Sequence, residues 1–342
     1  MMLKWISQIY GFFVDRRNKV FDAGERPSVE FDRPVISVGN LNVGGTGKTP
    51  HVEYLVRLLR ERYATAVLSR GYGRRTKGYR MAKEGDTAHT LGDEPYQYFN
   101  KFGLPGRDPI SVAVSEKRVL GAAELIADRD PAVILLDDAF QHRHIKAGLH
   151  ILLTTFDKPY TRDELIPLGR LREPIKGANR ADIIIVTKCP SDITEAQRQR
   201  IQKELAPKSH QRLFFSTFAY AAIRPQGEIR IERPEKIIAL AGIAEPKPFL
   251  NELKQRYEVV SEHLYRDHHR FSKSDVLRLR RDLQQRGDGS TIVVTTEKDW
   301  TRLLPLKDMW KDIPLYTLPV EAVIEPKVEF DELILNYVGK SK

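Results

Sequence analysis

The stretch VISVGNLNVGGTGKTP, residues 35–50, decides the fold class of this chain. It runs from β-branched apolar residues into closely spaced glycines, followed at once by a lysine and a threonine. Glycines let consecutive main-chain N–H groups turn inward around a phosphate, a lysine reaches the terminal phosphates, and a hydroxyl coordinates Mg²⁺. The stretch therefore predicts a P-loop that binds a nucleotide through Asn42, Val43, Gly44, Gly45, Thr46, Gly47, Lys48 and Thr49.

The usual P-loop pattern has a glycine where this chain has Asn42. Asparagine tolerates left-handed backbone angles better than most residues, so we expect the turn to persist. The helix expected at 49–62 points its N-terminus at the phosphates and adds a positive field to the site.

Short apolar runs alternate with helical stretches after the P-loop, for example at 64–69, 132–138 and 181–188. Such runs suit strands buried on both faces, and their alternation with helices predicts an α/β fold with a doubly wound parallel sheet. Proline, glycine and charge at 221–236 indicate a linker. We expect an amphipathic helix at 1–22, a P-loop domain at 23–220 and a smaller α/β domain at 237–342. The last helix, at 327–339, fits on either domain.

Two carboxylates end one of the predicted buried strands, in AVILLDDAFQH. A buried strand that ends in Asp137 and Asp138 is costly unless a cation lies there. P-loop enzymes hold Mg²⁺ with an acid in this position, so we predict that the pair binds the metal, with either carboxylate as the direct ligand.

A later strand, IIIVTKCP, bears on the choice between ATP and GTP. GTPases commonly place an aspartate that reads guanine shortly after such a Thr-Lys pair. Here Thr187 and Lys188 occupy the matching positions, but Pro190 stands where the aspartate would be. The absence of that aspartate favours ATP.

The net charge and the cysteine count limit the kinds of partner and compartment that the chain fits. The net charge is +10, which favours acidic partners such as phosphorylated metabolites, anionic lipid or nucleic acid. A single cysteine, Cys189, fits a reducing compartment and excludes a cysteine-rich zinc site. No apolar run approaches the roughly 20 residues that span a bilayer.

Residues 2–21 place apolar side chains at helical spacing before a basic end, which fits either a helix packed on its own domain or one lying in a membrane interface.

Beyond these local signals, the chain resembles the tetraacyldisaccharide 4′-kinases of lipid A biosynthesis over nearly its whole length. The motifs that carry the resemblance are ISVGNLNVGGTGKTP (36–50), SRGYGRR (69–75), GDEP (92–95), DDAFQHR (137–143), IPLGRLREP (166–174), DHHRF (267–271) and TTEKDW (295–300). Two departures occur: Ala139 replaces a usual glycine and Arg170 a usual proline. The resemblance implies transfer of the γ-phosphate of ATP to the 4′-hydroxyl of a lipid disaccharide 1-phosphate, at the cytoplasmic face of the inner membrane of a Gram-negative bacterium.

The resemblance also implies roles for particular residues. Asp93 would accept the hydroxyl proton together with His268, beside Asp267, across a cleft between the domains. Lys48 and Mg²⁺, held by Thr49 and the two aspartates, would neutralise the phosphates. Read without the resemblance, Asp93 fits the cap of a following helix, and adjacent histidines are a weak zinc signal without a third ligand.

Further basic and aromatic residues are candidates for substrate contact. Arg70 and Tyr72 follow a strand, where parallel sheets bind ligands. The resemblance places Arg172 and Glu173 near the site, where they could bind phosphate or form a salt bridge within the loop. Arg118, which opens a helix, is another candidate for anion contact.

A four-chain lipid substrate stays in the bilayer, so the resemblance favours membrane contact by the N-terminal helix through Trp5, Phe12 and Phe13. It predicts no nucleic-acid partner and no obligate protein partner. Two other classes remain as alternatives. A P-loop regulatory switch or metal-insertion chaperone would call for a guanine-reading aspartate, and a nucleic-acid-binding ATPase for basic residues clustered in a stripe.

Overall fold

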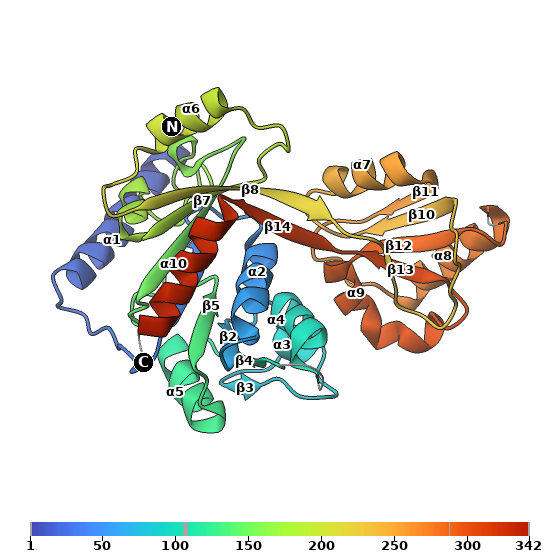
Figure 1. Cartoon of the computed structure of the whole chain (residues 1–342), viewed down its shortest axis with the longest axis horizontal. Coiled ribbons are helices and arrows are strands. Elements are labelled where there is room, and N and C mark those ends of the chain that lie inside the picture. The colour runs from blue at the N-terminus through green and yellow to red at the C-terminus, as the bar shows by residue number, and fades with distance from the viewer. Residues whose placement is uncertain (1, 105–108, 287, 341–342) are drawn as a thin grey trace.

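The structure, a computed structural model, describes residues 2–104, 109–286 and 288–340, which form two α/β domains (Figure 1). The larger sheet has nine strands within these residues, in the order β14-β8-β7-β6-β1-β5-β2-β4-β3. Its strands are β1 (Val35–Asn40), β2 (Thr65–Ser69), β3 (Arg80–Met81), β4 (Ser111–Val114), β5 (Val133–Asp137), β6 (Leu149–Thr155), β7 (Ile183–Thr187), β8 (Arg212–Tyr220) and β14 (Val320–Glu325).

The interior of this sheet is parallel, and only its two edge pairs, β14 with β8 and β3 with β4, are antiparallel. The predicted doubly wound parallel sheet is therefore confirmed. β1 lies between β5 and β6 and is buried along its whole length, because its apolar residues meet helices on both faces. Val38 pairs with Asp137, so the register brings the acidic end of β5 to the edge where the P-loop begins.

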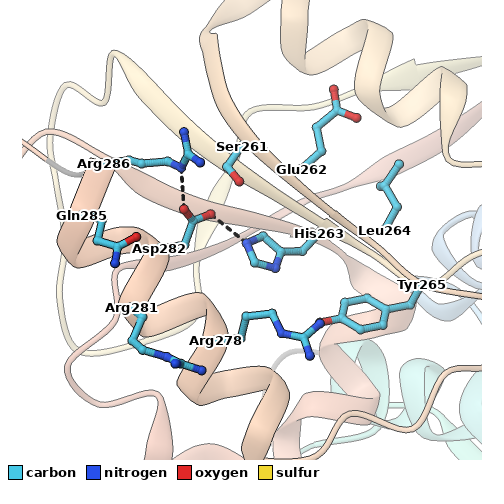
Figure 2. A pocket seen from close by; sticks show the side chains of 10 residues that line it. All are labelled: Ser261, Glu262, His263, Leu264, Tyr265, Arg278, Arg281, Asp282, Gln285 and Arg286. Carbon is cyan, nitrogen blue, oxygen red and sulfur yellow. Dashed lines mark hydrogen bonds and ion pairs between the residues drawn. The ribbon is translucent and has the colours of Figure 1, made fainter.

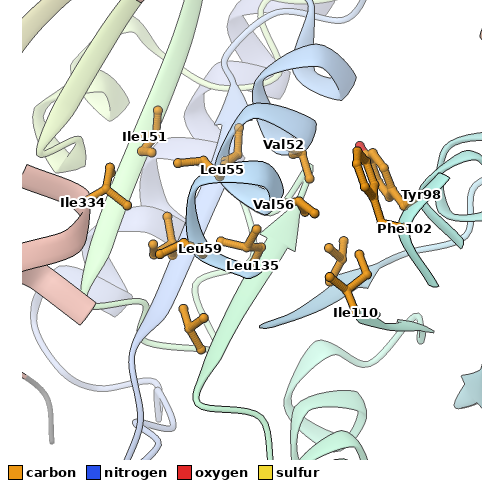
Figure 3. Packing of buried hydrophobic residues seen from close by; sticks show 14 of the residues in the cluster. Val52, Leu55, Val56, Leu59, Tyr98, Phe102, Ile110, Leu135, Ile151 and Ile334 are labelled. Atoms are coloured by element: carbon orange, nitrogen blue, oxygen red, sulfur yellow. The ribbon is translucent and has the colours of Figure 1, made fainter. Parts of the chain in front are cut away.

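Helices cover both faces of the larger sheet. One face carries α2 (Lys48–Arg60), α4 (Asp93–Tyr98) and α10 (Lys327–Lys340), and the other carries α5 (Arg118–Arg129) and α6 (Glu195–Leu205). α2 repeats apolar residues at helical spacing and buries them on the sheet: Val52, Leu55, Val56 and Leu59. Figure 3 shows these four side chains beside Leu135 and Ile151 of the strands.

Five further elements complete the first domain within the described residues. They are α1 (Met2–Asp22), α3 (Ala88–Leu91), the π-helix η1 (Phe99–Gly103) and the 3₁₀ helices η2 (Tyr160–Arg162) and η3 (Ile175–Arg180). None of the described helices is long and apolar enough to cross a membrane.

The second domain is a five-stranded sheet in the order β11-β10-β12-β13-β9. Its elements are β9 (Arg224–Pro225), β10 (Lys236–Ala241), α7 (Lys247–Arg256), β11 (Glu258–Leu264), α8 (Lys273–Arg286), β12 (Ile292–Thr296), α9 (Glu297–Leu303), η4 (Leu304–Met309) and β13 (Leu315–Leu318). Successive residues of β10 point to opposite faces of the sheet and enter different cores: Ile237 packs with α7, and Ile238 packs with α8. The segment 221–236, interpreted from the sequence as a linker, contributes β9 to this sheet.

The chain crosses between the domains twice, on two paired strands. β8 leads out of the first domain and β14 leads back, and they pair from Phe215 with Glu325 to Tyr220 with Val320 (Figure 1). α10 then packs on the first domain, where Phe330, Ile334 and Val338 enter the same core as α2. Of the two positions that the sequence left open for the last helix, the structure has the one on the first domain, whereas β14 was expected in the second domain and joins the first sheet instead.

Candidate active site

The P-loop connects β1 to α2, and two of its glycines adopt backbone angles that other residues avoid. Gly44 has φ +121° and Gly47 has φ +81°. A Cβ on Gly47 would also lie 2.5 Å from Cζ of Phe218. Thr187 on β7 donates to the Thr46 carbonyl at 2.8 Å and holds the loop against the sheet. The glycines are therefore required by the path of the chain.

Asn42 does not adopt the left-handed angles that the sequence suggested, because the turn is made at Gly44 and Gly47 instead. Its side chain is buried, and Nδ2 donates to Oδ2 of Asp163 at 2.9 Å. The neighbouring Val43 N–H donates to the Arg170 carbonyl at 2.7 Å. Asn42 thus joins the P-loop to the loop 163–172, and the expected turn persists although Asn42 itself is not left-handed.

Two cations converge beside the P-loop. The Lys48 ammonium lies 3.7 Å from Oδ1 of Asp138 and 3.4 Å from Oδ1 of Asn40. Arg172 donates to both carboxylate oxygens of Asp138, at 2.8 and 3.3 Å, and to the Asn40 carbonyl at 3.1 Å. A lysine and a forked guanidinium in this position are suited to bind the terminal phosphates of a nucleotide.

The two aspartates at the end of β5 have opposite electrostatic properties. Burial raises the pKa of Asp137 to about 7, with repulsion from Asp138 and Glu94 as further causes. Burial also acts to raise the pKa of Asp138, but Lys48 and Arg172 outweigh it and lower that pKa to about 2. Asp138 has φ +48°, a strained angle for a residue with a side chain. One carboxylate is therefore charged and paired, and the other is held where a cation would favour its ionised form.

The residues present fit Mg²⁺. The buried Asp137 carboxylate receives a hydrogen bond from Ser69 Oγ at 3.2 Å, and no lysine or arginine forms an ion pair with it among the described residues. No group of three or more histidine, cysteine or acidic side chains in the described part of the chain is placed to hold a metal. Mg²⁺ is usually held by one or two carboxylates together with substrate phosphates, so Asp137, Asp138 and the Thr49 hydroxyl are a suitable set.

Asp93 and His268 meet across the two domains. Asp93 is the first residue of α4, and its Oδ2 lies 3.1 Å from Nδ1 of His268. His268 follows β11 and has φ +58°. Asp93 makes no capping bond to its own helix, which begins after Gly92, so its carboxylate serves the contact between domains rather than the cap. Asp267 lies beside the ring, with Oδ2 3.7 Å from Nε2 of His268.

A third residue, Arg302 of α9, completes this contact and was missed by the sequence interpretation. Its Nε and Nη2 both donate to Oδ2 of Asp93, at 2.9 and 2.7 Å. Burial acts to raise the pKa of Asp93, but Arg302, His268 and Lys298 outweigh it and the pKa is lowered. Arg302 follows the TTEKDW motif closely, and this proximity was the available signal.

The Asp93–His268 pair lies close to the P-loop side of the sheet. Glu94, next to Asp93, is close enough to Asp137 to contribute to the rise of its pKa. Lys48 and Arg172, the carboxylates of Asp137 and Asp138, and the Asp93–His268 pair are therefore candidates for one site between the domains. Such groups are suited to phosphoryl transfer, with the donor phosphates beside Lys48 and Arg172 and the acceptor beside Asp93.

A family model described as Tetraacyldisaccharide-1-P 4'-kinase matches residues 1–339. The chain belongs to this family.

Curated members of the family are similar over nearly the full length. The tetraacyldisaccharide 4'-kinase of Bacteroides thetaiotaomicron is 42% identical over 361 residues, covering 99% of this chain and 94% of that protein. The Flavobacterium johnsoniae protein of the same name is 42% identical over 339 residues, with 97% and 95% covered. The crystal structure of LpxK from Aquifex aeolicus in complex with ATP matches with a TM-score of 0.78 and 27% identity, covering 98% of both chains. The predicted family and fold are confirmed.

The substrate candidates of this 4′-kinase lie in different environments. Arg70 and Tyr72 are exposed, and the Tyr72 ring lies edge-on to His268 with 6.2 Å between centroids. Arg118 is 2% exposed and donates to the main-chain carbonyls of Ser115 and Asp137, so its guanidinium supports the end of β5.

Arg172 and Glu173 are adjacent but serve different contacts. Arg172 pairs with Asp138 at the P-loop, as described above. Glu173 is buried, pairs with Arg180 at 2.9 Å and accepts hydrogen bonds from Asn18 and Gln141. Glu173 therefore ties α1 to the loop that carries Arg172.

The N-terminal helix of the kinase packs on its domain through polar and small residues and, near its end, through Phe21. Ser7, Gly11 and Asn18 are buried, and Ser7 Oγ donates to the Leu165 carbonyl at 2.9 Å. The opposite face exposes large apolar side chains to solvent: Met2, Leu3, Trp5, Ile6, Ile9, Phe12 and Phe13. A helix whose apolar face points away from its own domain presents a surface suited to a membrane interface.

A separate groove of about 550 Å³ lies between β11 and α8 of the second domain (Figure 2). In it His263 Nε2 lies 2.8 Å from Oδ2 of Asp282, and Asp282 also accepts from Arg286 at 2.5 Å. None of the lining residues belongs to the P-loop or to the Asp93 cluster, so this groove is not the site of phosphoryl transfer.

Proposed function

We propose that this chain performs the reaction of its family through the residues described above. As a tetraacyldisaccharide 4′-kinase, it transfers the γ-phosphate of ATP to the 4′-hydroxyl of a tetraacyl-disaccharide 1-phosphate, which forms lipid IVA in lipid A biosynthesis. The observation that carries the assignment of residues is the Asp93–His268 contact between domains beside the P-loop. Family membership displaces the regulatory switch, the metal-insertion chaperone and the nucleic-acid-binding ATPase as alternatives.

On the donor side, the P-loop amides with Lys48 and Arg172 bind the phosphates of ATP. Asp138 pairs with both cations and so orients them beside the P-loop. Thr49, Asp137 and Asp138 would hold Mg²⁺, which supplies charge neutralisation on the phosphates. Lys48 and Arg172 then face the charge that develops during transfer.

On the acceptor side, Asp93 takes the proton of the attacking hydroxyl. The hydrogen bonds that Arg302 and His268 make with its carboxylate all go to Oδ2, and no hydrogen bond within the described residues reaches Oδ1. Oδ1 is therefore the atom that receives the proton, while His268 supports the charged carboxylate through Oδ2.

The kinase works as a peripheral protein at the cytoplasmic face of the bacterial inner membrane. Support comes from the exposed apolar face of α1 and from a net charge of +10, which attracts anionic lipid. Arg70 and Tyr72, exposed near His268, contact the headgroup of the lipid substrate. No nucleic acid and no obligate protein partner are part of the proposal.

Transfer of labelled γ-phosphate from ATP to the tetraacyl-disaccharide 1-phosphate in detergent micelles tests the proposal. We expect a product labelled at the 4′ position, formed with Mg²⁺ and ATP and far more slowly with GTP, and no stimulation by DNA. A purified, folded protein that hydrolyses ATP without labelling the lipid would contradict it.

A further inference from the structure

We infer that Arg302 is a positioning residue, which orients Asp93 across the domain boundary and presents Oδ1 to the acceptor. The inference rests on the proposed role of Asp93 as proton acceptor. Arg302 itself touches neither ATP nor the reacting atoms in this arrangement, so it acts through the carboxylate that it holds.

The orientation of the guanidinium is unusual for an aspartate–arginine pair. Parallel forks normally place one N–H on each carboxylate oxygen. Here Nε and Nη2 both donate to Oδ2 of Asp93, and Nη2 also lies 3.2 Å from Nδ1 of His268. With the contact from His268 Nδ1, three polar contacts reach Oδ2, and none of the described residues donates a hydrogen bond to Oδ1.

Two groups of the second domain hold the guanidinium of Arg302 in place. Arg302 Nη1 donates to Oδ1 of Asp299 at 2.9 Å and to the Gly242 carbonyl at 2.8 Å. Asp299 is fully buried and accepts in turn from the Gly242 N–H and from Thr296 Oγ1. Arg302 therefore lies between two carboxylates, one from each domain, and the outer one can be oriented only when the domains meet.

Neighbouring ion pairs bring the same two elements together. Lys101 of η1 lies 2.6 Å from Oε2 of Glu53 in the first domain and 2.7 Å from Oε1 of Glu297 in α9. Lys298 of α9 lies 3.0 Å from Oε1 of Glu94 in α4. These pairs fix the position of α9 relative to α4, and this position places Arg302 against Asp93.

The guanidinium also keeps the Asp93 carboxylate ionised. Burial alone would raise the pKa of this group, and Arg302 is the largest of the influences that lower it. Without Arg302 the pKa of Asp93 rises, and a reaction that needs its ionised form loses rate at a higher pH than before. The acidic limb of the pH–rate profile therefore reports the contact.

The test compares Arg302→Ala and Arg302→Lys with the parent enzyme. We expect Arg302→Ala to lower kcat about 100-fold, as expected for a misplaced reacting group, with little change in KM for ATP, and to move the acidic limb to higher pH. Arg302→Lys keeps the charge without the fork, so it restores the position of the limb but only part of kcat. Parent-like kcat together with an unmoved limb in Arg302→Ala would overturn the inference.

Two controls keep the result interpretable. Arg280→Ala removes another arginine of the same domain, which pairs with Asp312 at 2.7 Å, and we expect it to leave the limb unchanged. If Arg302→Ala does not fold by circular dichroism, Arg302→Lys decides, and unchanged kcat in that variant overturns the inference. Asp93→Asn separates the two ideas: full activity in that variant refutes the role of Asp93, whereas its inactivity beside a normal Arg302→Ala refutes only the inference.

Discussion

The ammonium group of Lys48 lies 3.7 Å from Oδ1 of Asp138, so the P-loop lysine and the carboxylate that follows β5 face each other. Arg172 pairs with the same carboxylate at 2.8 Å. Asp138 thus fixes the positions of two cations that we propose to bind phosphate, and side chains that are already ordered lose less conformational entropy on binding.

Substituting Lys48 removes one of these cations. We expect Lys48→Ala to lower kcat at least about 100-fold, because a preorganised charge facing the transferring phosphoryl group is lost. KM for ATP rises as well, since the ground-state phosphates also lose a partner. Steady-state kinetics measure both constants, and Lys146→Ala, which removes an exposed lysine paired with Glu30, is the control. Parent-like kinetics in Lys48→Ala would refute the donor site.

The stability of the P-loop helix depends on a buried neutral histidine. Burial lowers the pKa of His51 from 6.5 to about 4, and its ring nitrogens contact the Gly47 carbonyl and Ser216 Oγ, both at 2.8 Å. The unfolded chain binds the proton more readily, so this contribution is full above pH 6.5 and is lost as the pH falls toward 4.

The loss amounts to about 1–1.5 kcal/mol by pH 5.5. Urea unfolding at pH 7.5 and 5.5 measures it, and we expect a smaller pH difference in His51→Gln, whose amide replaces the donor and acceptor of the ring. Equal pH differences in the two proteins would show that His51 is not the titrating group.

Membrane contact depends on the exposed face of α1. Replacing Trp5, Phe12 and Phe13 together by serine should lower partition onto anionic vesicles more than about 100-fold, because each large apolar side chain contributes about 1.5–3 kcal/mol when buried. ATP binding should remain. Leu120→Gln with Leu277→Gln is the control, since both leucines are exposed elsewhere. Vesicle sedimentation measures the partition, and an unchanged value in the triple variant discards membrane docking by α1.

Deleting the whole helix would be a poorer test. Tyr10 Oη donates to the Arg172 carbonyl at 2.7 Å, and Asn18 donates to Glu173. Truncation would therefore disturb the loop that carries a phosphate-binding arginine, and a loss of activity would not report on the membrane.

The ion pairs at the domain boundary predict a change in stability. Lys101→Met leaves the buried Glu53 with Arg57 and Gln97 as its remaining partners. We expect a loss of about 2–3 kcal/mol, somewhat less than is usual when a buried pair is broken, because those partners remain. Chemical denaturation measures the change. Lys327→Met, which removes an exposed pair with Asp331, should change stability by less than about 1 kcal/mol, and an equal loss in both variants would contradict the prediction.

Much of the first domain could be predicted from sequence because its strands are short apolar runs buried on both faces. β1, β5 and β7 lie where such runs occur, and the glycine pattern marks the P-loop between β1 and α2. β14 could not be placed in this way. Its residues alternate between buried and exposed, and a local pattern does not say which of two sheets a strand joins.

The site shows the same limit. Local motifs identified Lys48 and the two aspartates, because each of them lies in a short, recognisable pattern directly after a buried strand. Arg302 contacts Asp93 from 209 residues away, and within its own segment it resembles any basic residue of a helix. The side-chain contact of Asn42 was missed for a related reason: its partner, Asp163, is distant in sequence, so only the backbone preference of Asn42 was considered.

The two strands that join the domains, β8 and β14, are hydrogen-bonded to each other rather than running as separate tethers. A ladder of this kind resists stretching and sideways slip, because either would break several main-chain bonds at once, but it bends and twists readily. We therefore expect any movement of the second domain to bend or twist this two-stranded ladder rather than to slide one domain past the other, so a ligand between the domains would be approached along one path.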